Sequence, residues 1–131
     1  RLGLAARVGI GRCKLASNDV AGARSYYNSL LSAGTDDPAI LAAAGNGLAE
    51  CDYRSGQIKE AQLGFAKVAI VAAASPDEHA RALYFLGRCA NDLDEAGAES
   101  GGKARALMYF TEVQERYPNT TWAQQASQPR P

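Results

Sequence analysis

Residue types that would indicate a metal, redox or membrane protein are scarce in this chain of 131 residues. It has three cysteines, one histidine, one tryptophan and one methionine. The longest apolar run, 68–74, is too short to span a bilayer, which takes about 20 residues. Fourteen Lys and Arg balance fourteen Asp and Glu, so no charge excess is available to hold a nucleic acid or an anionic membrane. We therefore expect neither nucleic acid binding nor membrane insertion.

The three cysteines are informative through their spacing. They are odd in number, and the chain has no Cys-x-x-Cys pair and no histidine at ligand spacing, so they predict neither a disulfide framework nor a zinc site. Cys13, Cys51 and Cys89 are 38 residues apart, in the tripeptides Gly-Arg-Cys, Ala-Glu-Cys and Gly-Arg-Cys. A fixed period of about 20 to 50 residues is typical of stacked repeats. We interpret the cysteines as equivalent buried positions in three repeats.

The composition and the periodicity both favour helices. Hydrophobic residues make up 47% of the chain and charged residues 21%, and the abundance of alanine with few β-branched residues is typical of an all-α domain. Apolar residues recur with a helical period in segments that we predict to be helices: 2–16, 20–32, 37–54, a fourth from 57, 75–93, a sixth ending at 117 and a seventh from 121.

The second helix of each predicted pair repeats one pattern. Val20, Ala23, Tyr27 and Leu30 recur 38 residues later as Ile58, Ala61, Phe65 and Val68, and again as Ala106, Phe110 and Val113 after a loop that is seven residues longer. Gly11, Ala49 and Gly87 on the first helices should let the paired helices approach closely, while the aromatic residues fill the gap to the next unit. The chain is predicted to be one domain with units at 1–36, 37–74 and 75–118, and a further helix and tail at 119–131.

Several polar residues have local structural interpretations. Asp37 before Pro38 is typical of a helix start, and Ser75 with Glu78 has the spacing of a capping box, as does Thr121 with Gln124. His79 has no partner at ligand spacing and is predicted to be a surface residue. No nucleophile motif, phosphate loop or dinucleotide fingerprint is found. We expect no catalytic residues, no metal and no cofactor.

The order of small residue, alanine, aromatic residue and proline resembles the tetratricopeptide repeat (TPR) family over about residues 5–118, and Gly56 before Gln57-Ile58-Lys59-Glu60-Ala61 is similar to the family's turn. The period is 38 rather than the family's 34. The resemblance implies an all-α fold, an α-α superhelix (solenoid) of about three stacked hairpins plus a C-terminal partial repeat or capping helix. The segment 117–123 is similar to joins in bacterial cell-envelope members, such as outer-membrane assembly lipoproteins and Tol-Pal accessory proteins, which favours a periplasmic or cell-envelope location over a cytoplasmic one.

In that family the first helix of each unit lines a concave groove. The matching positions here give a predicted partner-binding groove of Arg12, Asn46, Glu50, Tyr53, Arg54, Tyr84, Arg88 and Asn91. The family's clamp for C-terminal carboxylates is not reproduced, because Val8 and Arg12 stand where Lys and Asn are needed. The row formed by Arg12, Glu50 and Arg88 is the part that we expect to carry function.

The sequence thus predicts a non-enzymatic module that binds a peptide or helix of a partner protein. The chain begins at Arg1 without a methionine, and we expect it to be a piece of a larger scaffold protein. Two alternatives are a structural spacer or homo-oligomerising solenoid, and a regulatory domain of a larger enzyme.

Overall fold

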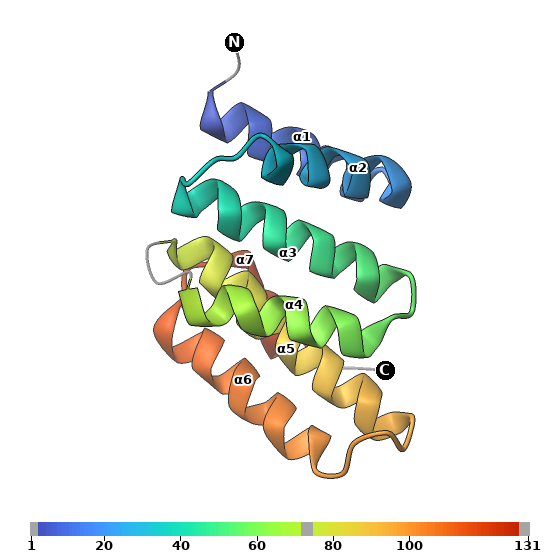
Figure 1. Ribbon diagram of the computed structural model, residues 1–131. Helices are drawn as coiled ribbons and strands as arrows, with labels where there is room; N and C mark the ends of the chain where they lie inside the picture. Colours follow the sequence, from blue (N-terminus) through green and yellow to red (C-terminus); the bar gives the residue numbers. More distant parts are fainter. Residues whose placement is uncertain (1–2, 72–74, 129–131) are drawn as a thin grey trace.

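The computed structural model describes residues 3–71 and 75–128, which form seven α-helices and no β-strand (Figure 1). The predicted all-α class is confirmed. None of these helices is long and apolar enough to cross a membrane. The helices are α1 (Leu4–Ala16), α2 (Val20–Ser32), α3 (Pro38–Arg54), α4 (Ile58–Val71), α5 (Pro76–Glu95), α6 (Gly102–Arg116) and α7 (Thr121–Ser127).

Local chemistry explains where most of these helices begin and end. Asp37 caps α3 as predicted, because its side chain accepts a hydrogen bond from the N–H of Ala39. Gly56 turns the chain from α3 to α4 with a φ of +83°, a conformation that favours glycine. The cap of α7 is Thr120 rather than Thr121, since the Thr120 side chain accepts from the N–H of Ala123.

The capping box predicted at the start of α5 is wrong. Ser75 precedes the helix but makes no side-chain cap bond. Glu78 is buried, and its carboxylate bonds to Arg12 and Arg81 instead of turning back to the backbone. Glu78 therefore forms a tertiary ion pair instead of the helix cap that the local sequence pattern predicted.

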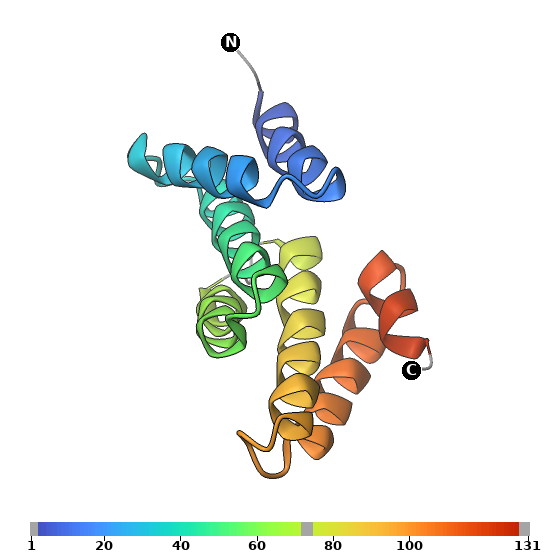
Figure 2. The ribbon, with the colours of Figure 1, turned by 90° about the vertical axis from the view of Figure 1, so that its right-hand side faces the viewer.

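The helices pack as neighbours along the chain and also in an odd-numbered row. The pairs α1 and α2, α3 and α4, and α5 and α6 are in contact, and each is joined to the next pair. In addition, α1 contacts α3, α3 contacts α5 and α5 contacts α7. Within the described residues, 3–71 and 75–128, no contact joins α2 to α4 or α4 to α6. Figure 2 shows α1, α3 and α5 in a row, with α7 on the opposite side of α5 from α4. The surface formed by α1, α3, α5 and α7 is called the inner face below.

Aromatic side chains packed against glycines hold the helices together. The ring of Tyr27 on α2 is fully buried, and it lies so close to Gly11 on α1 and Gly47 on α3 that a methyl group at either glycine would overlap it. Phe110 on α6 lies equally close to Gly87 on α5. The sequence pattern predicted Gly11, Gly87 and the aromatic positions but not Gly47, which belongs to the neighbouring unit.

Two predictions about buried residues are wrong. Cys51 and Cys89 are buried as expected, but Cys13 is exposed. Cys51 faces α2, the helix before its own, through a contact to the Val20 carbonyl, and no helix precedes α1 in the described ranges. His79, expected on the surface, is 7% exposed because its ring packs against Tyr117, the residue that follows α6.

Candidate functional site

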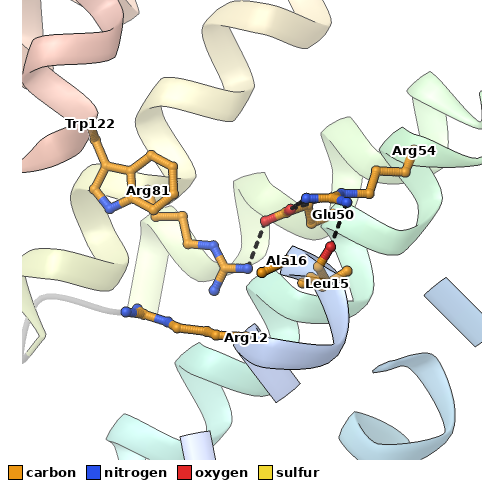
Figure 3. Close-up of a pocket in the computed structure, with 7 residues that line it drawn as sticks. All are labelled: Arg12, Leu15, Ala16, Glu50, Arg54, Arg81 and Trp122. Carbon is orange, nitrogen blue, oxygen red and sulfur yellow. Dashed lines mark hydrogen bonds and ion pairs between the residues drawn. The ribbon is translucent and has the colours of Figure 1, made fainter. Parts of the chain in front are cut away.

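A pocket on the inner face brings together residues from four helices. Its walls are Arg12, Leu15 and Ala16 from α1, Glu50 and Arg54 from α3, Arg81 from α5 and Trp122 from α7, and its volume is about 190 Å³ (Figure 3). Each odd-numbered helix contributes at least one side chain. We call this hollow the inner pocket.

Arg81 lies at the centre of the inner pocket. Its side chain is 2% exposed, and its guanidinium donates to Glu50 Oε1 at 2.8 Å and to Glu78 Oε1 at 3.3 Å. Burial alone lowers the pKa of Arg81, but the charges of Glu50 and Glu78 outweigh it and raise the pKa above its ordinary value. The arginine is therefore a permanently charged, buried link between α3 and α5.

Two more arginines extend this ion pair to the pocket rim. Arg12 bonds to Glu78 Oε2 at 2.7 Å and to Asp77 Oδ2 at 2.9 Å. Arg54 bonds to Glu50 Oε2 at 2.8 Å, and it also donates to the Leu15 carbonyl at the end of α1 at 2.8 Å. Their side chains are 43% and 35% exposed. The network spans α1, α3 and α5, so it fixes the relative position of the three helices.

Trp122 forms the wall opposite α3. Its ring packs against Tyr84 and Phe85 on α5, with ring centroids 5.7 and 5.8 Å apart, and the Arg81 guanidinium carbon lies 6.0 Å from its centre. The indole Nε1 is buried and has no hydrogen-bond partner in the part of the chain that the structure describes. Figure 3 shows this nitrogen on the ring edge turned toward Arg12.

A second cluster follows along α3 and α5. The Arg88 guanidinium carbon lies 5.1 Å from the ring centre of Tyr53 and 5.8 Å from that of Tyr84, distances typical of cation–π contacts. The Tyr53 hydroxyl donates to Asp92 Oδ2 at 2.5 Å. Burial and this hydrogen bond raise the pKa of Tyr53 above its ordinary value. The cation of Arg88 is thus held by two aromatic rings.

The predicted groove residues are distributed over different environments. Arg12, Glu50 and Arg54 meet in the inner pocket, whereas Tyr53, Tyr84 and Arg88 form the second cluster. The other two predicted residues lie outside both groups. Asn46 is fully buried and donates to the backbone carbonyl and to Oε1 of Glu78, both at 2.9 Å. Asn91 lines a separate hollow between α5, α6 and α7.

Burial limits what some of these residues can contact. Tyr84 is 4% exposed and packs against the rings of Phe85, Phe110 and Trp122. Glu50 is 7% exposed, and both of its carboxylate oxygens are bonded to arginines. The expected row of Arg12, Glu50 and Arg88 is therefore divided: Glu50 supports the network, and the two arginines belong to different clusters.

The sequence interpretation did not identify Arg81, Glu78 or Asp77 as parts of the site. Arg81 stands three residues before Tyr84 and seven before Arg88, so one more helical turn along the predicted groove positions would have included it. Trp122 was predicted to face inward, and its ring does pack against the core. Its contact with Arg81 depends on how α7 folds back, which no local pattern specifies.

The chemistry of the remaining reactive groups is restricted. Burial raises the pKa of the Cys51 thiol, and it raises that of Cys89 to about 12, so both stay protonated at neutral pH and are weak nucleophiles. His79 Nδ1 lies 2.5 Å from the Tyr117 hydroxyl. Across 3–71 and 75–128, no three His, Cys, Asp or Glu residues are placed to hold a metal ion.

Comparisons of the chain with protein-family models, with curated proteins and with solved structures found no match. The site is therefore interpreted from its own residues and geometry.

Proposed function

We propose that the chain is a non-enzymatic interaction module, a short solenoid of TPR-like hairpins that binds a peptide or helix of a partner protein on its inner face. The observation that carries this proposal is the inner pocket, to which all four odd-numbered helices contribute. Concave sites with a few directed polar groups are the usual location of ligands. Arginine and tryptophan are the side chains most enriched among strong binding contacts.

The buried ion network supports the proposal because it holds the pocket rigid. Arg81 bonds to Glu50 and Glu78, and Arg12 and Arg54 complete the contacts of the two carboxylates. A buried ion pair contributes little net stability compared with apolar packing, since desolvation offsets the attraction. It does fix side-chain positions in advance, and such preorganisation lowers the entropy cost of binding.

The buried thiols of Cys51 and Cys89 are poor candidates for a catalytic nucleophile. Cys51 and Cys89 are buried with raised pKa values, whereas a reactive cysteine needs an exposed site that stabilises its thiolate.

Selection from a displayed peptide library tests this proposal without knowledge of the natural partner. We expect enriched peptides to bind the unmodified chain and to lose at least about tenfold in affinity for the double variant Arg12→Gln, Arg54→Gln. The matched control is Lys59→Gln with Lys67→Gln, which removes the same two charges from exposed positions of α4 and should leave affinity unchanged. No enrichment, or equal loss in both double variants, would refute an inner-face binding site.

A second candidate function, a self-associating spacer, is favoured by apolar side chains on the even-numbered helices. Leu63 and Ile70 on α4 and Leu107 and Met108 on α6 are 60% to 81% exposed. Light scattering of the isolated chain distinguishes the two candidates. A concentration-dependent dimer that Leu107→Glu abolishes supports the spacer, whereas a monomer at all concentrations rules it out.

A further inference from the structure

The unpaired polar atoms of the inner pocket are hydrogen-bond donors. Arg81 Nε and Trp122 Nε1 are both buried and have no hydrogen-bond partner among residues 3–71 and 75–128. The carboxylate of Glu50 already accepts hydrogen bonds, from Arg81 at Oε1 and from Arg54 at Oε2. A buried donor without a partner is unfavourable, and a ligand that supplies an acceptor removes that cost.

The charges in and behind the pocket favour an anionic acceptor. Three guanidinium groups line it, those of Arg12, Arg54 and Arg81, against the single carboxylate of Glu50. Glu78 lies behind them, 6% exposed. Without Asp77, the network joins three guanidinium groups, of which those of Arg12 and Arg54 are partly exposed, to two carboxylates. One further negative charge would balance them.

Asp77, at the rim of the pocket, provides this negative charge through its ion pair with Arg12. Its side chain is 51% exposed and its Oδ2 lies 2.9 Å from Arg12 NH2. Exposed ion pairs of this kind are weak because solvent screens them, so Asp77 is a replaceable partner. A carboxylate entering the pocket would pair with the partly exposed Arg12, and it would reach the two buried donor nitrogens through a shift of their side chains.

We propose that the inner pocket binds the carboxylate of an aspartate or glutamate side chain from an acidic segment of a protein partner. This inference rests on the proposed function and names the chemistry of the partner. A volume of about 190 Å³ accommodates a side chain rather than a helix, so the rest of the segment lies along the inner face. When Asp77 leaves Arg12, one added carboxylate restores the balance of three guanidinium groups against three carboxylates, whereas a doubly charged phosphate exceeds it.

Trp122, the single tryptophan of the chain, provides a direct test. The labelled chain is titrated with a blocked peptide that contains three glutamates among alanines and glycines, and with its glutamine counterpart, while the indole N–H resonance is followed by NMR. We expect the glutamate peptide to shift this resonance downfield and the glutamine peptide to leave it in place. A phosphoserine peptide of the same length serves as a third arm and should bind no more tightly than the glutamate peptide.

Three variants identify the residues responsible. Arg12→Gln should weaken binding of the glutamate peptide roughly tenfold, because a charge-assisted bond is lost. Asp77→Asn should strengthen it several-fold, because it frees Arg12 from its competitor. Lys59→Gln on α4 removes the same charge as Arg12→Gln and should have no effect.

Three results would overturn the inference: an indole resonance that does not move, an equal response to the glutamate and glutamine peptides, or tighter binding of the phosphopeptide. Amide shifts at Tyr53 and Arg88 without a response of Trp122 would remove the pocket assignment but leave inner-face binding in place. The inner-face proposal itself fails if the library selection gives no peptide that depends on Arg12 and Arg54.

Discussion

Arg81 is the residue on which the inner pocket depends most. It is almost completely buried, and it bonds to two carboxylates that in turn hold Arg12 and Arg54. Removing one partner of a buried ion network costs more than the network contributes, because charges are left buried without compensation. Its loss should therefore affect folding as well as binding.

Replacing Arg81 with methionine should lower the free energy of unfolding by about 3 kcal/mol, since Glu50 and Glu78 would stay buried with fewer partners. Urea-induced unfolding measures the change. Arg116→Met is the matched control, because Arg116 forms an exposed pair with Glu112, and it should have little effect. Equal stability of the Arg81→Met variant and the unmodified chain would show that the network is not structurally important.

His79 should make stability depend on pH. Burial, and then the nearby charge of Arg116, lower the pKa of His79 below its ordinary 6.5, so the unfolded chain binds more protons between these two pKa values. The free energy of unfolding should be highest above about pH 6.5 and should decrease as the pH falls toward the lower, folded-state pKa.

Unfolding curves between pH 5 and 7.5 check this, with His79→Gln as the comparison. His79 is the only histidine in the chain, so the variant should lose most of the slope in this range. The same slope in both proteins would contradict the assignment.

At the scale of helices, the close contacts between glycines and aromatic rings set the spacing. Gly47 on α3 lies against the ring of Tyr27, and an added Cβ would come within 2.2 Å of it. Tyr27 is fully buried, so its ring has no open space to move into. The glycine is therefore required by packing rather than by backbone conformation.

Gly47→Ala should destabilise the fold by about 1–3 kcal/mol, the usual cost of overpacking a core. Gly9→Ala is the matched control, because Gly9 also lies inside a helix but an added Cβ meets no atom of the described residues within 4 Å. It should stabilise the chain by about 0.5–1 kcal/mol through its better helix propensity. Thermal unfolding of both variants measures the difference, and a similar loss in both would mean that the ring does not restrict Gly47.

The sequence predicted the helices well because their signals are local. Asp37, Gly56 and the repeated apolar positions act within one or two turns of the chain. Glu78 shows the limit of such signals, because its spacing from Ser75 fits a capping box while the folded chain uses it in an ion pair with α1. Cys13 has the sequence context of Cys51 and Cys89 but is exposed in the folded chain. Neither the ion pair of Glu78 nor the exposure of Cys13 can be predicted from the sequence of a single helix.

For the whole molecule, the arrangement of odd-numbered helices determines which surface is available to a partner. The odd-numbered helices contact one another in the order α1, α3, α5 and α7. These contacts bring Arg12, Glu50, Arg81 and Trp122 to one pocket, although Arg12 and Trp122 are 110 residues apart in the sequence. Arg12, Glu50 and Arg54, which the family resemblance placed in the predicted groove, line this pocket. The part contributed by α7 could not be predicted, since it depends on the fold of the complete chain.

Binding on the inner face is tested by a map of the backbone amide shifts that a library-selected peptide causes in the labelled chain. The perturbed amides should concentrate on α1, α3, α5 and α7 around Arg12, Arg54, Arg81 and Trp122, with α2, α4 and the outer side of α6 unchanged. Perturbations centred on α2, α4 or the exposed apolar residues of α6, with the inner face unaffected, would contradict it.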